Sequence, residues 1–367
     1  MEYILIEECC DILDSRRIPI TASDRMSGPY PYYGANGVQD YVADYIFDDE
    51  LVLLAEDGGN FGSKTRPIAY RVSGKCWVNN HAHVLKPMAS MDVDYLCYSL
   101  MFYDTGELVN GATRQKLTQT AMRKMLIPQR SLQEQKRIVC ELSKVQSIIS
   151  ARQQQLQKLD ELVKARFVEM FGGIHNSNKY PYKPIKELTD VISGGTPNRD
   201  VNEYWECGTI PWVKTTELQN NLIKKVDEYI TEKGLNSSSA KLVPPGTVLI
   251  AMYGQGKTRG MTAYLNIEAC TNQACACILP SDQINQTFLW KFLILSYDDL
   301  RGMAKGGNQP NLNGTIIKNY PILYPPRELQ EQFAAFVAQT DKSKVAVQKA
   351  LDEAQLLFDS LMQKYFG

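Results

Sequence analysis

An internal repeat restricts the fold of this chain more than any other feature of its sequence. The matching stretches follow one another in the same order in both halves: LVLLAEDG (51–58) with TVLIAMYG (247–254), NNHAHVLKP (79–87) with TNQACACILP (271–280), GATRQKLT (111–118) with GGNQPNLN (306–313), and IPQRSLQEQ (127–135) with YPPRELQEQ (324–332). Both halves end in Phe-Gly, at Phe171 and Phe366. The period of about 195 residues is far longer than the roughly 20–50 residues of a solenoid repeat, so we expect a duplicated domain with a duplicated helix.

The end of each half has a heptad pattern that predicts a long helix. Ser131 and Glu134 form a capping box after Pro128, and Gly172 ends the first helix. The predicted coiled-coil seam follows a 4-3 spacing in which eight of ten positions in each helix are apolar. In the first helix these are Ile138, Leu142, Val145, Ile149, Leu156, Leu159, Val163 and Met170, with Arg152 and Arg166 as the exceptions; in the second they are Phe333, Val337, Val347, Leu351, Ala354, Phe358, Leu361 and Tyr365, with Thr340 and Lys344 as the exceptions.

These helices would be about 55–60 Å long at roughly 1.5 Å per residue, and each needs a partner to bury its apolar stripe. The nearest partner is the other helix. The alternative is two ordinary core helices of one domain, which usually have about 10–14 residues. One irregularity remains, because the two LQEQ tetrads are offset by two residues more than the two seams are.

Length and composition set the class of the chain. Its 367 residues suffice for two domains, and 44% hydrophobic and 22% charged residues are typical of a globular protein. Apolar runs stay short of the roughly 18–20 residues that span a bilayer, and the start, MEYILIEE, is acidic where a signal peptide is basic. We therefore expect a cytoplasmic protein without a membrane partner. The nine cysteines show no paired spacing, which predicts reduced and mostly buried thiols.

The stretch AMYGQGKTRG (251–260) is similar to a phosphate-binding loop through Gly256, Lys257 and Thr258. A P-loop opens a helix, however, whereas the following residues alternate and predict a strand. The repeat also has Ser63 where the loop needs a glycine. A nucleotide hydrolase therefore remains a rival hypothesis, and a coiled-coil protein adaptor is a second.

Two groups of side chains have the spacing of metal ligands. His81 and His83 lie on one face of an expected strand, and Cys270, Cys275 and Cys277 cluster in the second half. The repeat does not keep a common ligand set, so we expect these residues to pack in the strands and predict no metal site.

Several stretches in combination resemble the specificity subunit of type I restriction–modification systems. In the first half these are GPYPYYGANGVQDYV (28–42), LLAEDG (53–58) and KCWVNNHAHVLKP (75–87); in the second half they are SGGTPNRDVNEYW (193–205), IPWVKTTEL (210–218) and VLIAMYGQGKTRG (248–260). GATRQKLT departs from the more usual form that GGNQPNLN shows. The resemblance extends over nearly the whole chain.

The resemblance implies an α+β fold, with two globular target-recognition domains in pseudo-twofold repeat joined by two long antiparallel coiled-coil helices. The segments would be 1–130 for the first domain, 131–174 for the central helix, 175–327 for the second domain and 328–367 for the C-terminal helix. Each domain would read one half of a bipartite double-stranded DNA target. The helices would dock two methyltransferase subunits, and a motor–nuclease subunit joins such complexes. Catalysis, S-adenosylmethionine and ATP would belong to the partners, so the chain would be non-catalytic and without a cofactor.

The net charge of −1 does not indicate a nucleic-acid partner, so DNA contacts require local loops. Base reading needs forked or paired hydrogen-bonding groups, and phosphate binding needs Lys, Arg and backbone amides. The loops that meet these needs contain the predicted DNA-binding residues Lys64, Thr65, Arg66, Arg114, Gln115, Lys116, Gln255, Lys257, Thr258, Arg259, Asn308, Gln309 and Asn311.

Overall fold

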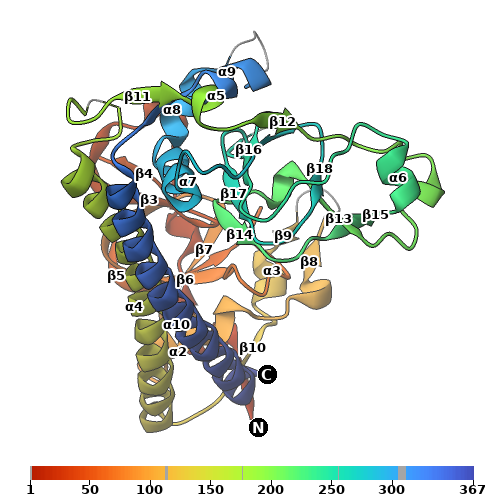
Figure 1. Ribbon diagram of the computed structural model, residues 1–367. Helices are drawn as coiled ribbons and strands as arrows, with labels where there is room; N and C mark the ends of the chain where they lie inside the picture. Colours follow the sequence, from red (N-terminus) through yellow and green to blue (C-terminus); the bar gives the residue numbers. More distant parts are fainter. Residues whose placement is uncertain (1, 112–114, 176, 255, 305–310) are drawn as a thin grey trace. The chain divides into compact units, whose positions relative to one another are not determined.

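The structure is a computed structural model that describes residues 2–111, 115–175, 177–254, 256–304 and 311–367. The chain forms two compact units: unit 1 combines Met1–Gln153 with Lys349–Gly367, and unit 2 is Gln154–Gln348. The two longest helices are α4 (Leu132–Phe171) and α10 (Arg327–Phe366), of 40 residues each (Figure 1). Each unit therefore contains half of each long helix. The four segments predicted from the sequence are each continuous in the chain, whereas unit 1 combines two separate stretches. The boundaries of the four segments stay a prediction.

Unit 1 is built on a six-stranded sheet. Its strands lie in the order β2 (Cys10–Ile12), β7 (Ala82–Pro87), β5 (Phe47–Ala55), β6 (Ala69–Val78), β3 (Ser27–Gly34) and β4 (Gly37–Val42). β5 is antiparallel to β6 and β7, whereas β3 runs parallel to β6. Val52 and Leu54 belong to one buried cluster and Leu51 and Leu53 to another. Because successive side chains of a strand point to opposite faces, burial of both faces explains the continuous apolar run of β5.

Unit 2 repeats this topology. Its five-stranded sheet has the order β12 (Val191–Ser193), β19 (Cys275–Ile278), β16 (Val248–Ala251), β17 (Thr262–Leu265) and β14 (Asn221–Ile223). β16 is antiparallel to β17 and β19, and β14 runs parallel to β17, as β3 does to β6. The duplicated α+β domain expected from the sequence is therefore confirmed. A three-stranded sheet of β15 (Glu228–Ile230), β13 (Ile210–Val213) and β18 (Cys270–Thr271) is added in this unit.

Short elements complete both units. The small strand pairs are β1 (Tyr3–Leu5) with β10 (Leu126–Pro128), β8 (Val109–Asn110) with β9 (Lys116–Leu117), and β11 (Tyr182–Pro184) with β20 (Pro321–Leu323). The short helices are α1 (Ile6–Cys9), α2 (Val93–Met101) and α3 (Gln119–Met122) in unit 1, and α5 (Ile185–Leu188), α6 (Glu232–Asn236), α7 (Gln286–Leu295), α8 (Tyr297–Gly302) and α9 (Gly314–Lys318) in unit 2.

Gln135 and Gln330 explain the irregular offset of the LQEQ tetrads. Both side chains are 1% exposed. Gln135 accepts a hydrogen bond from the amide of Asp92 at 2.7 Å, and Gln330 accepts one from the amide of Asn285 at 2.9 Å. Asp92 and Asn285 are the N-caps of α2 and α7. Gln135, the last glutamine of the first tetrad, thus corresponds to Gln330, the first glutamine of the second. The starts of the two helices therefore align with the same offset as the two seams, and it is the match between the LQEQ letters that is shifted by two residues.

The start of α4 has the predicted cap in a modified form. The Ser131 hydroxyl accepts from the amide of Glu134 at 3.3 Å, as an N-cap does. The Glu134 carboxylate accepts from the Ser131 hydroxyl at 3.2 Å. The side chains of the capping box therefore interact directly with each other.

The long helices share a core within each unit. In unit 1, Ile138 and Leu142 of α4 belong to the same buried cluster as Phe358 and Tyr365 of α10. In unit 2, Val163 of α4 belongs to one cluster with Phe333 and Val337 of α10, and Val347 is 7% exposed. The other predicted seam residues divide into the buried Val145, Ile149 and Ala354 and the half-buried Leu156, Leu159, Met170, Leu351 and Leu361.

The predicted seam misses Phe167, which is fully buried, and passes instead through the half-buried Arg166. Val163, Phe167 and Phe171 are four residues apart, a spacing that widens the buried face. The physical reason is that this part of α4 packs against α7 as well as α10: the Phe167 ring lies 5.8 Å from that of Phe288 and 5.5 Å from that of Phe333.

The nine cysteines are free, and seven of them are buried, which confirms the expected thiols. Among the helices in the described parts of the chain, none combines the length and apolar character needed to cross a bilayer.

Candidate nucleic-acid interface

The two Lys-Thr-Arg triplets lie in corresponding connections. Residues 64–66 lie between β5, which ends at Ala55, and β6, which begins at Ala69. Residues 257–259 lie between β16, which ends at Ala251, and β17, which begins at Thr262. Because these strands occupy the same positions in the two sheets, each unit presents its triplet at the same end of the same strand pair.

In unit 1 a serine organises the triplet. The Ser63 hydroxyl accepts from the amides of Thr65 at 3.3 Å and Arg66 at 2.9 Å. This side-chain turn leaves Lys64, Thr65 and Arg66 exposed. Exposed lysine and arginine side chains on an ordered turn can contact phosphate and can donate to base edges.

In unit 2 helix α8 organises the triplet. Arg301 donates to the carbonyls of Gly256 at 2.8 Å and Arg259 at 2.7 Å, and the Tyr297 hydroxyl donates to that of Lys257 at 2.6 Å. These contacts hold the backbone of the loop while the Lys257 side chain remains exposed. Sequence reasoning missed Arg301 and Tyr297, because no local pattern marks an arginine that contacts a loop about 40 residues away.

The same loop does not have the architecture of a phosphate-binding loop. Thr258 and Arg259 are half-buried, and the chain continues into strand β17, not into a helix. A P-loop needs the N-terminal amides of a helix to surround the phosphate. The predicted strand is therefore confirmed, and the nucleotide-hydrolase hypothesis lacks its geometric basis.

The second pair of predicted loops runs beside the triplet connections. The Leu117 amide donates to the carbonyl of Glu56 at 2.8 Å, and the Leu312 amide donates to that of Met252 at 3.0 Å. Both leucines are fully buried and anchor these segments in corresponding places. The remaining predicted residues divide by burial: Gln115 and Lys116 are exposed, Asn311 is half-buried, and Arg114, Gln255, Asn308 and Gln309 lie outside the described residues.

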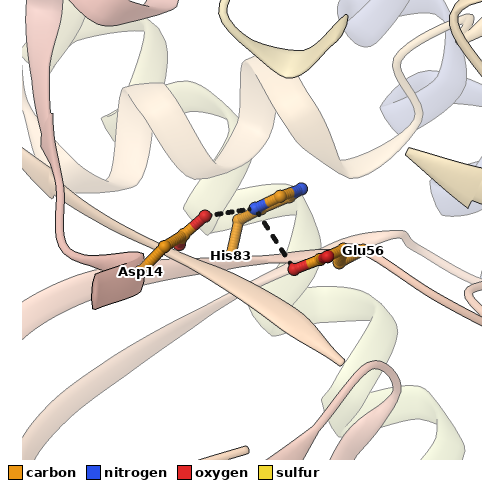
Figure 2. Close-up of side chains that lie close together, drawn as sticks. All are labelled: Asp14, Glu56 and His83. Atoms are coloured by element: carbon orange, nitrogen blue, oxygen red, sulfur yellow. Dashed lines mark hydrogen bonds and ion pairs between the residues drawn. The ribbon is translucent and has the colours of Figure 1, made fainter. Parts of the chain in front are cut away.

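Behind this surface in unit 1 lies a buried ionic network, shown in Figure 2. His83 is fully buried, and its Nδ1 lies 2.6 Å from Oδ2 of Asp14 and 3.7 Å from Oε2 of Glu56. Its Nε2 lies 2.9 Å from the carbonyl oxygen of Leu117. The ring thus lies between the Asp14 carboxylate on its Nδ1 side and the Leu117 carbonyl on its Nε2 side. His83 therefore connects the core to the segment that carries Lys116.

Positive side chains balance the two carboxylates. Arg17 Nη1 donates to Glu56 Oε2 at 2.6 Å, and Arg17 Nη2 lies 3.5 Å from Asp14 Oδ2. Lys116 Nζ lies 3.2 Å from the other oxygen of Glu56. Burial would raise the pKa of Asp14, but the hydrogen bond and charge of His83, the amide of Val84 and the charge of Arg17 together hold this pKa below its ordinary value of 3.8.

Asp14, Glu56 and His83 also have the spacing of a metal site, with ligand atoms within 4.8 Å of one another. Their oxygens already accept from Arg17 and Lys116, so a divalent cation would have to displace these charges. We interpret the cluster as an ion-pair network. Sequence reasoning considered His83 as a packing residue and missed its partners, which only the sheet order brings close.

The fold is similar to those of solved type I specificity subunits. The S subunit of the type I restriction–modification system of M. genitalium superimposes with a TM-score of 0.58, covering 100% of this chain and 96% of that one at 15% identity. A second solved chain comes from a structure described as showing the complex assembly and conformational transition of the type I R-M system. It superimposes with a TM-score of 0.56, covering 100% of this chain and 97% of that one at 17% identity. At these identities the likeness concerns the fold, two repeated domains of mixed helix and sheet.

Sequence relatives carry the same description. A Haemophilus influenzae protein named type I restriction enzyme specificity subunit S.HindORF215P is 28% identical over 100% of this chain and 93% of its own length. The MjaVIII specificity subunit of Methanocaldococcus jannaschii is 22% identical over 95% of this chain and 89% of its own. The profile of the type I restriction modification DNA specificity domain matches residues 1–161 and 178–354. The chain belongs to this family.

Proposed function

We propose that this protein is the DNA-recognition subunit of a type I restriction–modification complex, and that each unit reads one half of a bipartite duplex target. The observation that carries the proposal is the placement of the two Lys-Thr-Arg triplets in corresponding connections of the two sheets. Each triplet has a neighbouring segment, around Lys116 in unit 1 and around Asn311 in unit 2. Together they supply the donors that phosphates and base edges require.

The long helices would form an antiparallel coiled-coil pair. This arrangement is supported by the cores, because the first half of α4 packs with the last half of α10 in unit 1 and the remaining halves pack together in unit 2. Helices of 40 residues are about 60 Å long. Acting as a ruler, they would separate the half-sites by a non-specific spacer of around one turn of duplex.

The outer faces of these helices would dock the methyltransferase subunits. They present large apolar side chains to solvent: Ile148 (49% exposed), Leu162 (48%) and Val168 (43%) on α4, and Val345 (71%), Leu356 (69%) and Leu357 (51%) on α10. Contiguous exposed apolar patches mark protein–protein interaction sites, and these side chains would contribute to such patches on the proposed docking faces. Methyl transfer with S-adenosylmethionine, and ATP-driven nuclease action, would then belong to the partners, and this chain would be non-catalytic.

The test uses the chain assembled with its methyltransferase subunit. Lys257→Ala should weaken binding to the full target about tenfold or more, since one good contact contributes about 1–3 kcal/mol. Lys257→Ala should lower discrimination against altered bases in the half-site that unit 2 reads and leave discrimination at the other half-site intact. Lys64→Ala should lower discrimination at the half-site that unit 1 reads and leave the half-site of unit 2 unaffected. Competition with duplexes altered in one half-site measures this, with Lys241→Ala, an exposed lysine of unit 2 outside these loops, as the control.

An equal loss of discrimination at both half-sites, or no loss of discrimination at either, would contradict the proposal. The slope of affinity against salt separates it from the adaptor hypothesis, because a protein that neutralises phosphates loses affinity linearly in the logarithm of the salt concentration. An adaptor that binds only protein would show no such association with duplex.

A further inference from the structure

Unit 1 has a cavity of about 840 Å³ at the C-terminal end of α10. Its walls are mostly apolar and include Tyr3, Ser99, Phe102, Met362 and Phe366. A cavity of several hundred cubic ångströms accommodates several side chains. Ser63 and Lys64 at the first triplet are among its lining residues, whereas Thr65 and Arg66 are not.

The repeat identifies the corresponding place in unit 2. Tyr3 pairs with Pro128 in the β1–β10 ladder, and Tyr182 pairs with Leu323 in the β11–β20 ladder, so Tyr3 corresponds to Tyr182. Phe366 corresponds in the same way to Phe171, since each ends a long helix.

Ring contacts confirm this correspondence. The Phe366 ring lies 5.2 Å from that of Tyr95 in α2, and the Phe171 ring lies 5.3 Å from that of Phe288 in α7. Ser99 and Phe292 each follow four residues later on those helices. Three residues of the cavity wall, Tyr3, Ser99 and Phe366, therefore have defined counterparts in unit 2.

In unit 2 these counterparts hold a segment of the chain itself, the connection between α4 and β11. The Tyr182 hydroxyl donates to the carbonyl of Ile174 at 3.0 Å. The Phe171 ring lies 6.2 Å from that of Tyr180, and the Phe292 ring lies 6.2 Å from that of His175.

Ile174 and Tyr180 are partly buried against the core of unit 2. An irregular peptide with one aliphatic and one aromatic anchor therefore covers this place in unit 2. The corresponding place in unit 1 is the open cavity.

We propose that the unit 1 cavity is a docking groove for an extended peptide of a partner protein, with an aliphatic anchor, an aromatic anchor and a basic side chain. The anchors follow from Ile174 and Tyr180. The basic side chain follows from charge. Among the described residues that line the cavity, Asp104 and Asp359 are acidic and Lys64 is basic, and the connection in unit 2 carries Lys179. This partner contact goes beyond DNA recognition, and it shares Lys64 with the proposed DNA-binding triplet of unit 1.

A synthetic peptide with the sequence of residues 172–181, labelled with fluorescein, tests the groove. Its anisotropy is titrated with the full-length chain in the absence of DNA. We expect saturable binding that Met362→Lys weakens about tenfold or more, because a charge in the partly buried wall opposes the apolar anchors and a positive charge also repels the basic side chain of the peptide. Leu356→Lys is the matched control, since Leu356 lies on the same helix, is 69% exposed and does not line the cavity.

Phe102→Ala gives a second variant of the wall, and thermal melting verifies that each variant is folded. A peptide with alanine in place of Ile174 and Tyr180 should bind about tenfold more weakly. Three results would overturn the proposal: no saturable binding, equal affinity of the peptide for the Met362→Lys and Leu356→Lys chains, or equal affinity of the chain for the parent and alanine peptides. Because DNA is absent from the assay, its result is distinct from that of the half-site experiment.

Discussion

Phe167 of α4 and Phe333 of α10 pack edge to face, with ring centroids 5.5 Å apart and ring planes at 82°. Both rings are fully buried, and Phe171 and Phe288 complete the cluster. Aromatic pairs in this geometry contribute about 0.5–1.5 kcal/mol beyond the burial of their area. This contact joins the two long helices within unit 2.

Replacing Phe167 tests how much this cluster contributes. We predict that Phe167→Ala lowers the free energy of unfolding by about 3–5 kcal/mol, because it leaves a cavity in a fully buried site. Val168→Ala, at the next and 43% exposed position, should change it by less than about 1 kcal/mol. Denaturant unfolding of both variants measures the difference, and similar values for the two would contradict a core role for Phe167.

Gln135 and Gln330 should be equivalent in energy as well as in position. Gln135→Ala and Gln330→Ala each leave a partly buried backbone amide, that of Asp92 or that of Asn285, without its acceptor, which costs about 1–3 kcal/mol. Gln135→Ala also removes the donor to the carbonyl of Arg130 at 2.9 Å, and Gln330→Ala removes the donor to the carbonyl of Pro325 at 2.8 Å.

Gln133→Ala, at an exposed position of the same helix, is the control for the glutamine pair. Hydrogen exchange at the N-termini of α2 and α7 locates the effect. Protection that stays unchanged at both termini would show that the two glutamines do not share this role.

Asp14 should make unit 1 sensitive to acid. Its pKa in the folded protein lies below its ordinary value of 3.8, so the ionised carboxylate stabilises the folded state above about pH 4, and this contribution is lost as the pH falls through the lower folded pKa. We predict that the melting temperature falls more steeply below pH 4 for the parent chain than for Asp14→Asn. Parallel curves from pH 7 to pH 3 would refute the assigned role of Asp14.

Cysteine reactivity should follow burial. Burial raises the pKa of Cys76 and Cys97 to about 12 and that of Cys270 to about 11, so these thiols are protonated at neutral pH as well as inaccessible. Cys140 and Cys207 are exposed. Brief treatment of the native chain with iodoacetamide, followed by peptide mass spectrometry, should modify these two first. Early modification of Cys76 or Cys97 would indicate that unit 1 opens more readily than its packing suggests.

The sequence alone determined the repeated architecture and both long helices, because the signals for these features are local. Heptad spacing, the Ser131 cap and the Lys-Thr-Arg triplets after strands depend on residues within a few positions of one another. The register of the repeat was less clear, since the identical LQEQ letters suggested a shift that the buried Gln135 and Gln330 do not make.

Only the tertiary structure decided which distant side chains meet. Asp14 and Glu56 reach His83 because β7 pairs with both β2 and β5, and Arg301 reaches the loop at Gly256 because α8 lies beside it. Phe167 is buried where the heptad pattern places Arg166, since α7 adds a second packing surface to α4. Such contacts depend on the order of strands and on which faces are covered, and no periodicity along a single segment records either.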